Sequence, residues 1–190
     1  MIRKLTEKKK DNSKRNQLFL ALFLIGIMIF GTVGYSFMSG GENGEEEIET
    51  KVYSGMKFTK YNNYWNLEKD GLSLAFSVFP SSNQTINSQV KNYLVYDSEP
   101  LYIYSEDYSS TSEIYNNFNQ IAQRIQLACY EKDCGENLPI KDCLSNFIII
   151  KESNITNISQ QENCVFIEGK SEELLNLTDE FLFKTFKIKE

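Results

Sequence analysis

Residues 146–152, NFIIIKE, form a short unbroken apolar run that ends in two charged side chains. Such a run predicts a central β-strand buried on both faces of a sheet. Two further strands are predicted directly after it, NITNIS at residues 154–159 and CVFIEG at residues 164–169, which Gly169 ends. Their spacing is typical of a hairpin, so the C-terminal half of the chain predicts a sheet centred on residues 146–152.

The chain before residue 146 alternates between strand and helix patterns. Residues 51–61, 64–79 and 100–106 predict strands, with a turn at residues 69–71, and residues 83–94 and 109–129 predict helices. Ser110 and Glu113 have the spacing of a capping box at the start of the longer helix. A final helix is expected to begin near Thr178 as its N-cap residue. Alternating strands and helices predict a small α/β domain with parallel strands, and an α+β meander is the alternative.

The chain has 4 cysteines and no histidine, and the cysteines follow the predicted long helix. Only the gap between Cys129 and Cys134 has the C-x₂₋₄-C spacing of zinc ligands, whereas a zinc site needs two such pairs, and the C-x-x-C of a thioredoxin-like centre is absent. An even number of cysteines in a small external domain predicts disulfides. We expect Cys129 to pair with Cys134 and Cys143 with Cys164, because the last two flank strands predicted to be neighbours. A four-cysteine metal site and a thiol redox centre are the alternatives.

The N-terminal part of the chain predicts a membrane anchor. Residues 1–16 carry seven basic and two acidic side chains, a net charge of +5, and residues 17–38 carry no charged side chain. A helix of about 20 apolar residues crosses a bilayer, and basic residues favour the cytoplasmic side. We therefore expect a basic cytoplasmic tail, a single transmembrane helix and an extracytoplasmic remainder, and a cleaved signal peptide is the alternative.

The segment after the predicted anchor is acidic. Residues 39–50 are rich in glycine and glutamate and predict a flexible spacer before a domain at residues 51–190. The whole chain has a net charge of −6, so without the +5 tail the remainder is about −11. This charge argues against nucleic acid as a partner. The expected partners are the lipid bilayer, through the anchor, and another protein of the cell envelope.

The absence of histidine restricts the enzyme classes that the chain can belong to, because it excludes the common catalytic triads and histidine-ligated metals. Ligands of parallel α/β sheets bind beyond the carboxyl ends of the strands. The residues expected at this edge are Ser81, Ser82, Glu106 and Asp107, which form a candidate ligand loop, with a plain polar loop and helix cap as the alternative. No cofactor, metal site or catalytic residue is predicted.

Two further groups of residues are candidates for surface roles. Tyr61, Tyr64 and the single tryptophan, Trp65, form a candidate aromatic patch, although aromatic residues in strands also serve the core. Four asparagines begin N-x-[ST] glycosylation sequons, barely more than composition alone predicts: Asn83, Asn154, Asn157 and Asn176.

The basic tail, the single anchor, the acidic spacer and the pattern LAC…C…LP…C…FIII…NCVFIEG together resemble uncharacterised single-pass membrane proteins of small-genome archaea. The resemblance covers mainly residues 95–190 and implies no activity, cofactor or catalytic residue. The sequence thus predicts a non-enzymatic, membrane-anchored interaction or accessory domain of the cell envelope. The alternatives are an envelope enzyme or solute-binding domain that uses Glu106 and Asp107, and a thiol-based redox or metal protein.

Overall fold

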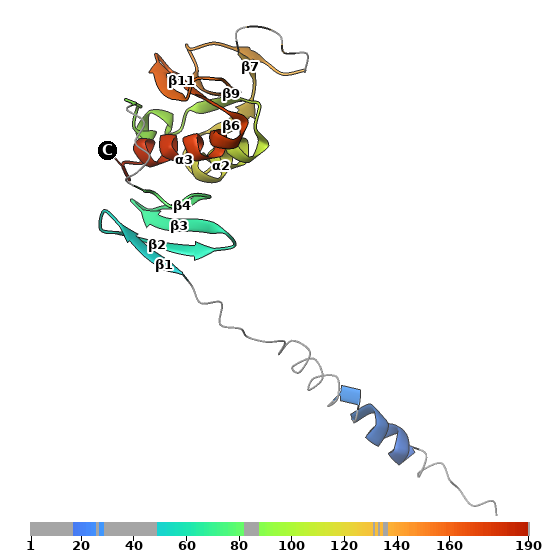
Figure 1. The fold of residues 1–190 in the computed structure, drawn as a ribbon. Coiled ribbons are helices and arrows are strands. Elements are labelled where there is room, and N and C mark those ends of the chain that lie inside the picture. The colour runs from blue at the N-terminus through green and yellow to red at the C-terminus, as the bar shows by residue number, and fades with distance from the viewer. Residues whose placement is uncertain are drawn as a thin grey trace, which may run out of the picture. The chain divides into compact units, whose positions relative to one another are not determined.

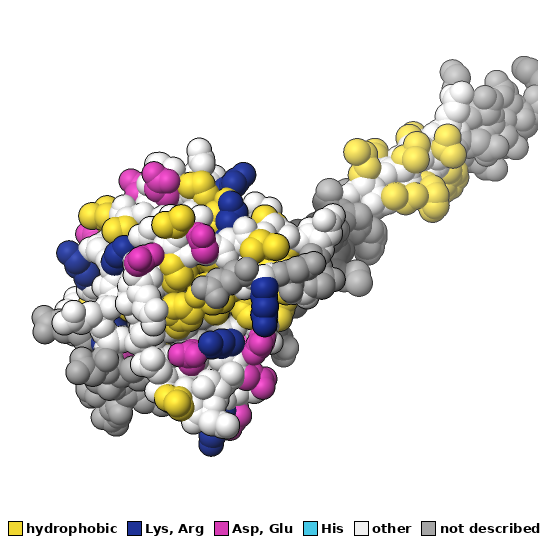
Figure 2. Space-filling view, turned by 90° about the horizontal axis from the view of Figure 1, so that it is seen from above, with side chains coloured by type: hydrophobic (Ala, Val, Ile, Leu, Met, Phe, Trp, Pro, Cys, Tyr) yellow, Lys and Arg dark blue, Asp and Glu magenta, His cyan; other side chains and the backbone are white. Residues whose placement is uncertain are grey.

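The structure is a computed structural model that describes residues 17–25, 27–28, 49–81, 88–130, 132, 134 and 137–189. The predicted tail at residues 1–16, residues 29–38 of the predicted anchor and residues 39–48 of the predicted spacer lie outside this range. Residues 17–25 and 27–28 are helical, and their exposed side chains are mostly apolar (Figure 2). Within the described residues, no helix has both the length and the apolarity needed to cross a bilayer.

The chain from residue 49 onward folds into a small α/β domain with two disulfides, as the sequence predicts (Figure 1). Its first part is an antiparallel meander of four strands in the order β1-β2-β3-β4. Each of its hairpins turns through two consecutive residues with positive φ, such as Asp70 at 53° and Gly71 at 79°. Such turns match the twist of the flanking strands. The meander strands are β1 Thr50–Tyr53, β2 Met56–Tyr61, β3 Tyr64–Lys69 and β4 Leu72–Phe76.

The second sheet has five strands in the order β10-β11-β9-β5-β6. The strands β11, β9, β5 and β6 are parallel, and β10 pairs antiparallel with β11 at one edge. The apolar run that predicted a central strand is β9, whose four apolar side chains are at most 1% exposed. The strands are β5 Pro100–Ser105, β6 Arg124–Leu127, β9 Asn146–Glu152, β10 Asn157–Gln161 and β11 Cys164–Gly169, and a separate short pair is formed by β7 Cys129–Tyr130 and β8 Ile140–Lys141.

The helices α2, Tyr108–Phe118, and α3, Leu174–Thr185, lie between the two sheets (Figure 1). They pack against each other, α2 also against β4 and β5, and α3 against β11 and β9. One apolar core therefore joins the meander, both helices and the inner face of the five-stranded sheet. A smaller core on the other face of that sheet includes Phe147, Ile149 and Phe166, and Tyr130 of the cysteine segment packs against it.

Helix α2 completes the edge of the meander through its side chains. The Asn117 side-chain amide donates to the Ala75 carbonyl oxygen (2.7 Å), and its oxygen accepts from the Ala75 N–H (3.0 Å). Glu113 of the same helix accepts the Ser77 N–H, and Gln120, in the turn directly after the helix, pairs with both backbone groups of Ser73. Every second residue of a strand is about 6.6 Å further along it, and helix positions three or four residues apart are about 4.5–6 Å apart along the helix axis. These similar spacings let successive side chains from one face of the helix reach successive backbone groups of the strand edge.

The bounds of all three predicted helices differ from those in the structure. The predicted helix 109–129 divides into α2 and the strand β6, because residues 119–123 form a turn and Ile125 then pairs with Leu101 of β5. In the predicted helix 83–94, residues 83–87 lie outside the described residues and residues 88–92 are not helical; a 3₁₀ turn, η1, covers Tyr93–Tyr96. Thr178 is not an N-cap residue, since α3 begins at Leu174, after the 3₁₀ turn η2 at Ser171–Glu173, and the Thr178 hydroxyl donates to the Leu174 carbonyl oxygen.

Candidate functional site

All four cysteines form disulfides with the predicted pairing. Cys129 bonds to Cys134, with 5.5 Å between their Cα atoms, and Cys143 bonds to Cys164, with 4.9 Å between their Cα atoms. The second disulfide joins the segment before β9 to the start of β11, and both strands are parallel neighbours in the sheet. The four-cysteine metal site requires four thiolates, whereas here every cysteine sulfur is bonded to another.

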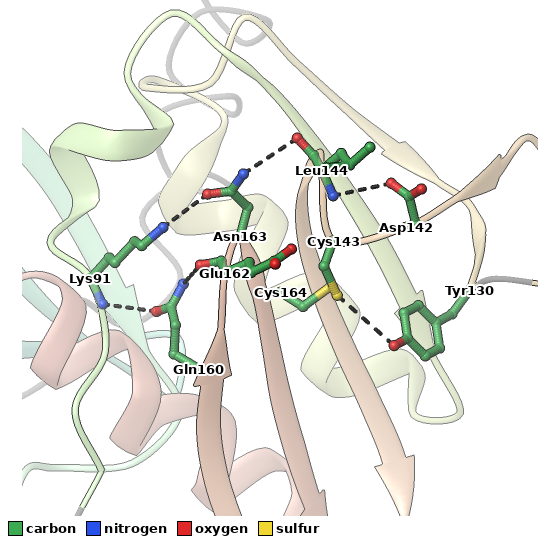
Figure 3. Close-up of a disulfide and its surroundings, with 9 residues drawn as sticks. All are labelled: Lys91, Tyr130, Asp142, Cys143, Leu144, Gln160, Glu162, Asn163 and Cys164. Atoms are coloured by element: carbon green, nitrogen blue, oxygen red, sulfur yellow. Dashed lines mark hydrogen bonds between the residues drawn. A yellow bond between two sulfur atoms is a disulfide. The ribbon is translucent and has the colours of Figure 1, made fainter.

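The surroundings of Cys143–Cys164 are a polar network (Figure 3). The Asn163 side chain donates to the Leu144 carbonyl oxygen and accepts from the Lys91 ammonium group (2.8 Å). Gln160 accepts from the Lys91 backbone N–H. The polar groups drawn around the disulfide thus bind one another and the segment before η1, which is typical of a structural site.

The acids of the candidate ligand loop hold the fold together at the carboxyl end of β5. Asp107 is the N-cap residue of α2, and its Oδ2 accepts the Ser110 N–H (2.6 Å). The predicted capping residue, Ser110, is instead buried within the first turns of the helix. Glu106 accepts from the Glu152 N–H (2.8 Å) and from the Tyr104 hydroxyl (3.2 Å), so its carboxylate links β5 to β9.

The serines of the candidate ligand loop do not complete a site with these acids. Ser81 follows β4, which belongs to the meander and not to the parallel sheet. The expectation that Ser81 lies at the carboxyl edge of the parallel strands is therefore wrong. The prediction treated the strand before Ser81 as part of the parallel sheet, whereas this strand pairs within a separate antiparallel sheet. Ser82 lies outside the described residues.

The candidate aromatic patch is divided between core and surface. Trp65 is 5% exposed and packs against Phe79, with 4.8 Å between ring centroids. Tyr64 is half-buried, and only Tyr61 is fully at the surface. These three residues do not form a continuous aromatic surface, because side chains alternate along the strand and Trp65 points into the core.

Of the four sequons, three fall on described residues. Asn154 is exposed in the connection between β9 and β10, Asn157 is half-buried in β10, and Asn176 is exposed on α3. Asn83 lies outside the described residues.

A buried pair of carboxyl groups joins the helices beneath the end of β4. Glu113 of α2 and Asp179 of α3 are 1% and 0% exposed, and Asp179 accepts the Val78 N–H (2.7 Å). Burial raises the pKa of Asp179 well above its usual value, and the hydrogen bond and negative charge of Glu113 raise it further. The pair is therefore a buried acidic site that retains a proton more readily than an exposed pair would.

A groove lies between α2 and the free edge of β6. It has a volume of about 570 Å³ and lies beside one exposed face of the helix. Tyr108 is 85% exposed and Leu127 is 40% exposed. The groove is lined by Ser105, Glu106, Tyr108, Thr111, Ser112, Tyr115, Asn116 and Leu127. Two tyrosine rings thus face the groove together with polar side chains, and tyrosine is enriched at protein-binding surfaces.

Two cations lie beside the same strand on the opposite face of the sheet. Arg124 of β6 donates to the Tyr102 hydroxyl (2.8 Å), and the Lys141 ammonium group of β8 lies 4.6 Å from the centre of the Tyr102 ring. Burial alone would raise the pKa of the Tyr102 phenol, but hydrogen bonds and positive charge from Arg124 and Lys141 lower it below its usual value. Neither cation makes an ion pair with a carboxylate of the described residues.

Neither feature of the β6 edge follows from the predicted helix at residues 109–129, because residues 124–127 pair with β5 as a strand instead. One sequence signal pointed to the cations: Arg124 is the only arginine after Arg15, in a segment with a strongly negative net charge. The groove had no such signal, since its lining residues become neighbours only when α2 packs beside β6.

No protein-family model, curated protein or solved structure matches this chain.

Proposed function

We propose that this chain is a membrane-anchored interaction or accessory domain of the cell envelope, and not an enzyme. The apolar segment at residues 17–38 is the anchor, the basic residues 1–16 are cytoplasmic, and the disulfide-bonded domain lies outside. Its role is to present a folded surface to another envelope protein.

The observation that carries this proposal is the pairing of all four cysteines in a domain that follows a basic tail and an apolar segment. Disulfides persist in oxidising compartments and are rare in the cytosol. The orientation given by the basic tail places the domain in such a compartment. The groove beside β6, with its exposed tyrosine and leucine, supports an interaction role.

The alternatives have less support. A solute-binding or catalytic loop at Glu106 and Asp107 would need free carboxylates, but both acids bind backbone N–H groups of their own domain. A thiol redox protein would need a disulfide that opens readily; each disulfide has one fully buried cysteine, Cys129 or Cys164, and of their partners only Cys134 is exposed.

The proposal is tested by labelling single introduced cysteines in intact cells with a membrane-impermeant maleimide. Ser81→Cys places a thiol on an exposed residue of the domain, and Ser13→Cys places one in the basic tail. We expect only Ser81→Cys to react, and both variants to react after the membrane is permeabilised. The native cysteines are then blocked, reduced and labelled in a second step, and peptide masses identify their pairs.

Labelling of Ser13→Cys in intact cells, with Ser81→Cys protected, would reverse the orientation and refute the proposal. Native cysteines that react without reductant would contradict the oxidised state on which it depends. If fractionation recovers the chain without its first residues and free of membranes, the anchor is a cleaved signal peptide instead.

A further inference from the structure

The strand β6 is an unpaired edge of the five-stranded sheet. The sheet order ends at β6, and its other edge, β10, is the antiparallel hairpin strand. The outward backbone groups of an edge strand can pair with any extended chain of matching length. Among the described residues, no backbone group bonds to this outer edge; the Tyr115 hydroxyl donates to the Ile125 carbonyl oxygen at 3.3 Å.

The register identifies the groups that face outward. Leu101 lies opposite Ile125 and Ile103 opposite Leu127, and the Ala128 N–H donates to the Ile103 carbonyl oxygen (2.9 Å). In a parallel pair with this register, Gln126 and the N–H of Ala128 bond to β5, so the backbone groups of Ile125 and Leu127 face away from it. The edge therefore offers the outward N–H groups of Ile125 and Leu127 and the Leu127 carbonyl group, while the Ile125 carbonyl oxygen already accepts from the Tyr115 hydroxyl.

The side chains around this edge differ between the two faces of the sheet. Because side chains alternate along a strand, Leu127 lies on the helix side and lines the groove with Tyr108 and Tyr115 of α2. Arg124 lies on the other side, beside Tyr102 and Lys141. An added strand would thus place alternate residues over the groove lined by tyrosines and hydroxyls. The remaining residues would lie on the face that carries Arg124 and Lys141, whose charged groups lie at Tyr102 of the neighbouring strand β5.

We propose that β6 binds an extended segment of a partner protein as a sixth strand, and that this segment alternates apolar and acidic residues. Its backbone pairs with Ile125 and Leu127, its apolar side chains enter the groove beside Tyr108 and Leu127, and its carboxylates meet Arg124 and Lys141. Strand addition of this kind draws affinity from the backbone and specificity from alternate side chains. The inference rests on the proposed interaction role and names the class of partner.

The probe is an acetylated and amidated heptapeptide in which valine and glutamate alternate, titrated into the full chain in detergent micelles. Binding is followed by the backbone amide NMR signals of Ile125 and Leu127 and by the anisotropy of a labelled peptide. We expect shifts at these two amides, and weaker binding of a matched peptide with lysine in place of glutamate. Methylating the peptide amides one at a time should weaken binding about tenfold or more at alternate positions only, because only alternate amides face β6.

A charge-reversed variant separates recognition from folding. Arg124→Glu with Lys141→Glu should weaken binding of the glutamate peptide and strengthen binding of the lysine peptide, a reversal that misfolding cannot produce. Lys57→Glu, an exposed lysine of the meander, is the matched control and should change neither affinity.

Three results would overturn the inference: no shift at Ile125 and Leu127 with either peptide, equal effects of methylation at every amide, or shifts that depend on protein concentration without peptide, which would make a second copy the occupant. These outcomes are distinct from failure of the proposed function. The maleimide experiment decides location without any peptide, and peptide binding at β6 does not depend on which side of a membrane the domain occupies.

Discussion

Replacement of Asn117 by alanine tests whether helix side chains act as the missing neighbour of β4. Asn117 is fully buried and makes two hydrogen bonds to the backbone of Ala75, at 2.7 and 3.0 Å. Alanine removes both bonds and leaves an N–H and a carbonyl group of the strand without their partner. We expect the meander to lose stability and β4 to lose protection.

The magnitude follows from these two groups. A buried polar group left unsatisfied costs about 1–3 kcal/mol, and Ala75 is half-buried, so values near the lower end apply to each group. The higher helix propensity of alanine returns about 0.5 kcal/mol. The expected net loss in the free energy of unfolding is therefore about 2 kcal/mol. For a domain of this size the melting temperature should fall by about 6–8 °C.

Asn116→Ala is the matched control, since Asn116 is exposed on the neighbouring position of the same helix. It should be neutral or slightly stabilising. Urea denaturation of both variants gives the free energies, and hydrogen exchange at the Ala75 amide reports the local effect. The reasoning is refuted if Asn117→Ala loses no more stability than Asn116→Ala, or if the Ala75 amide exchanges as slowly as in the wild type.

Three other predictions concern buried groups. Asp179→Asn should become more stable relative to wild type as pH rises above about 4. The reason is that the pKa of Asp179 is higher in the folded than in the unfolded protein, so the stability that its protonated form contributes is lost as pH rises. Parallel pH profiles of the two proteins in urea melts would contradict this. Cys143→Ser with Cys164→Ser should cost about 1 kcal/mol more than loss of the other disulfide, since the bridged separation is 21 residues instead of 5, and equal costs in denaturation would exclude the loop-length explanation. Gly169→Ala should cost about 1 kcal/mol, because a Cβ there would lie 2.5 Å from Cδ1 of the buried Leu177 side chain, which must then change its rotamer; an unchanged melting temperature would show that this side chain adjusts freely.

The sequence predicted those parts of the fold that depend on local pattern. The apolar run at residues 146–152, the hairpin after it and the pairing of Cys143 with Cys164 are confirmed. The predicted long helix was wrong because Ile121 and Ile125 continue the helical spacing of the apolar stripe although the chain has already turned at residues 119–123. Residues 124–127 form a strand because they pair with β5, and the periodicity of the apolar residues does not reveal this pairing.

The division into two sheets was also beyond local pattern. Glu113 and Asn117 lie on one face of α2 and Gln120 lies in the turn after it, and their partners in the meander are 36 to 47 residues away. A polar stripe on a helix does not indicate whether its partner is water or a strand edge. The candidate acids were predicted at the correct end of β5, but their hydrogen bonds to backbone N–H groups depend on β9 and on the start of α2.

The order of strands in the meander determines how the domain would respond to mechanical load. The described chain enters through β1, which pairs only with β2, and β2 then pairs with β3. Pulling on the residues before β1 would separate these antiparallel hairpins one ladder bond at a time, starting at the outer strand. Both disulfides lie after residue 128 and cannot arrest this process. In a chain held by its N-terminal segment, the exposed strand β1 would therefore extend first, because β2, β3 and β4 contribute Phe58, Trp65 and Phe76 to the core that they share with the helices.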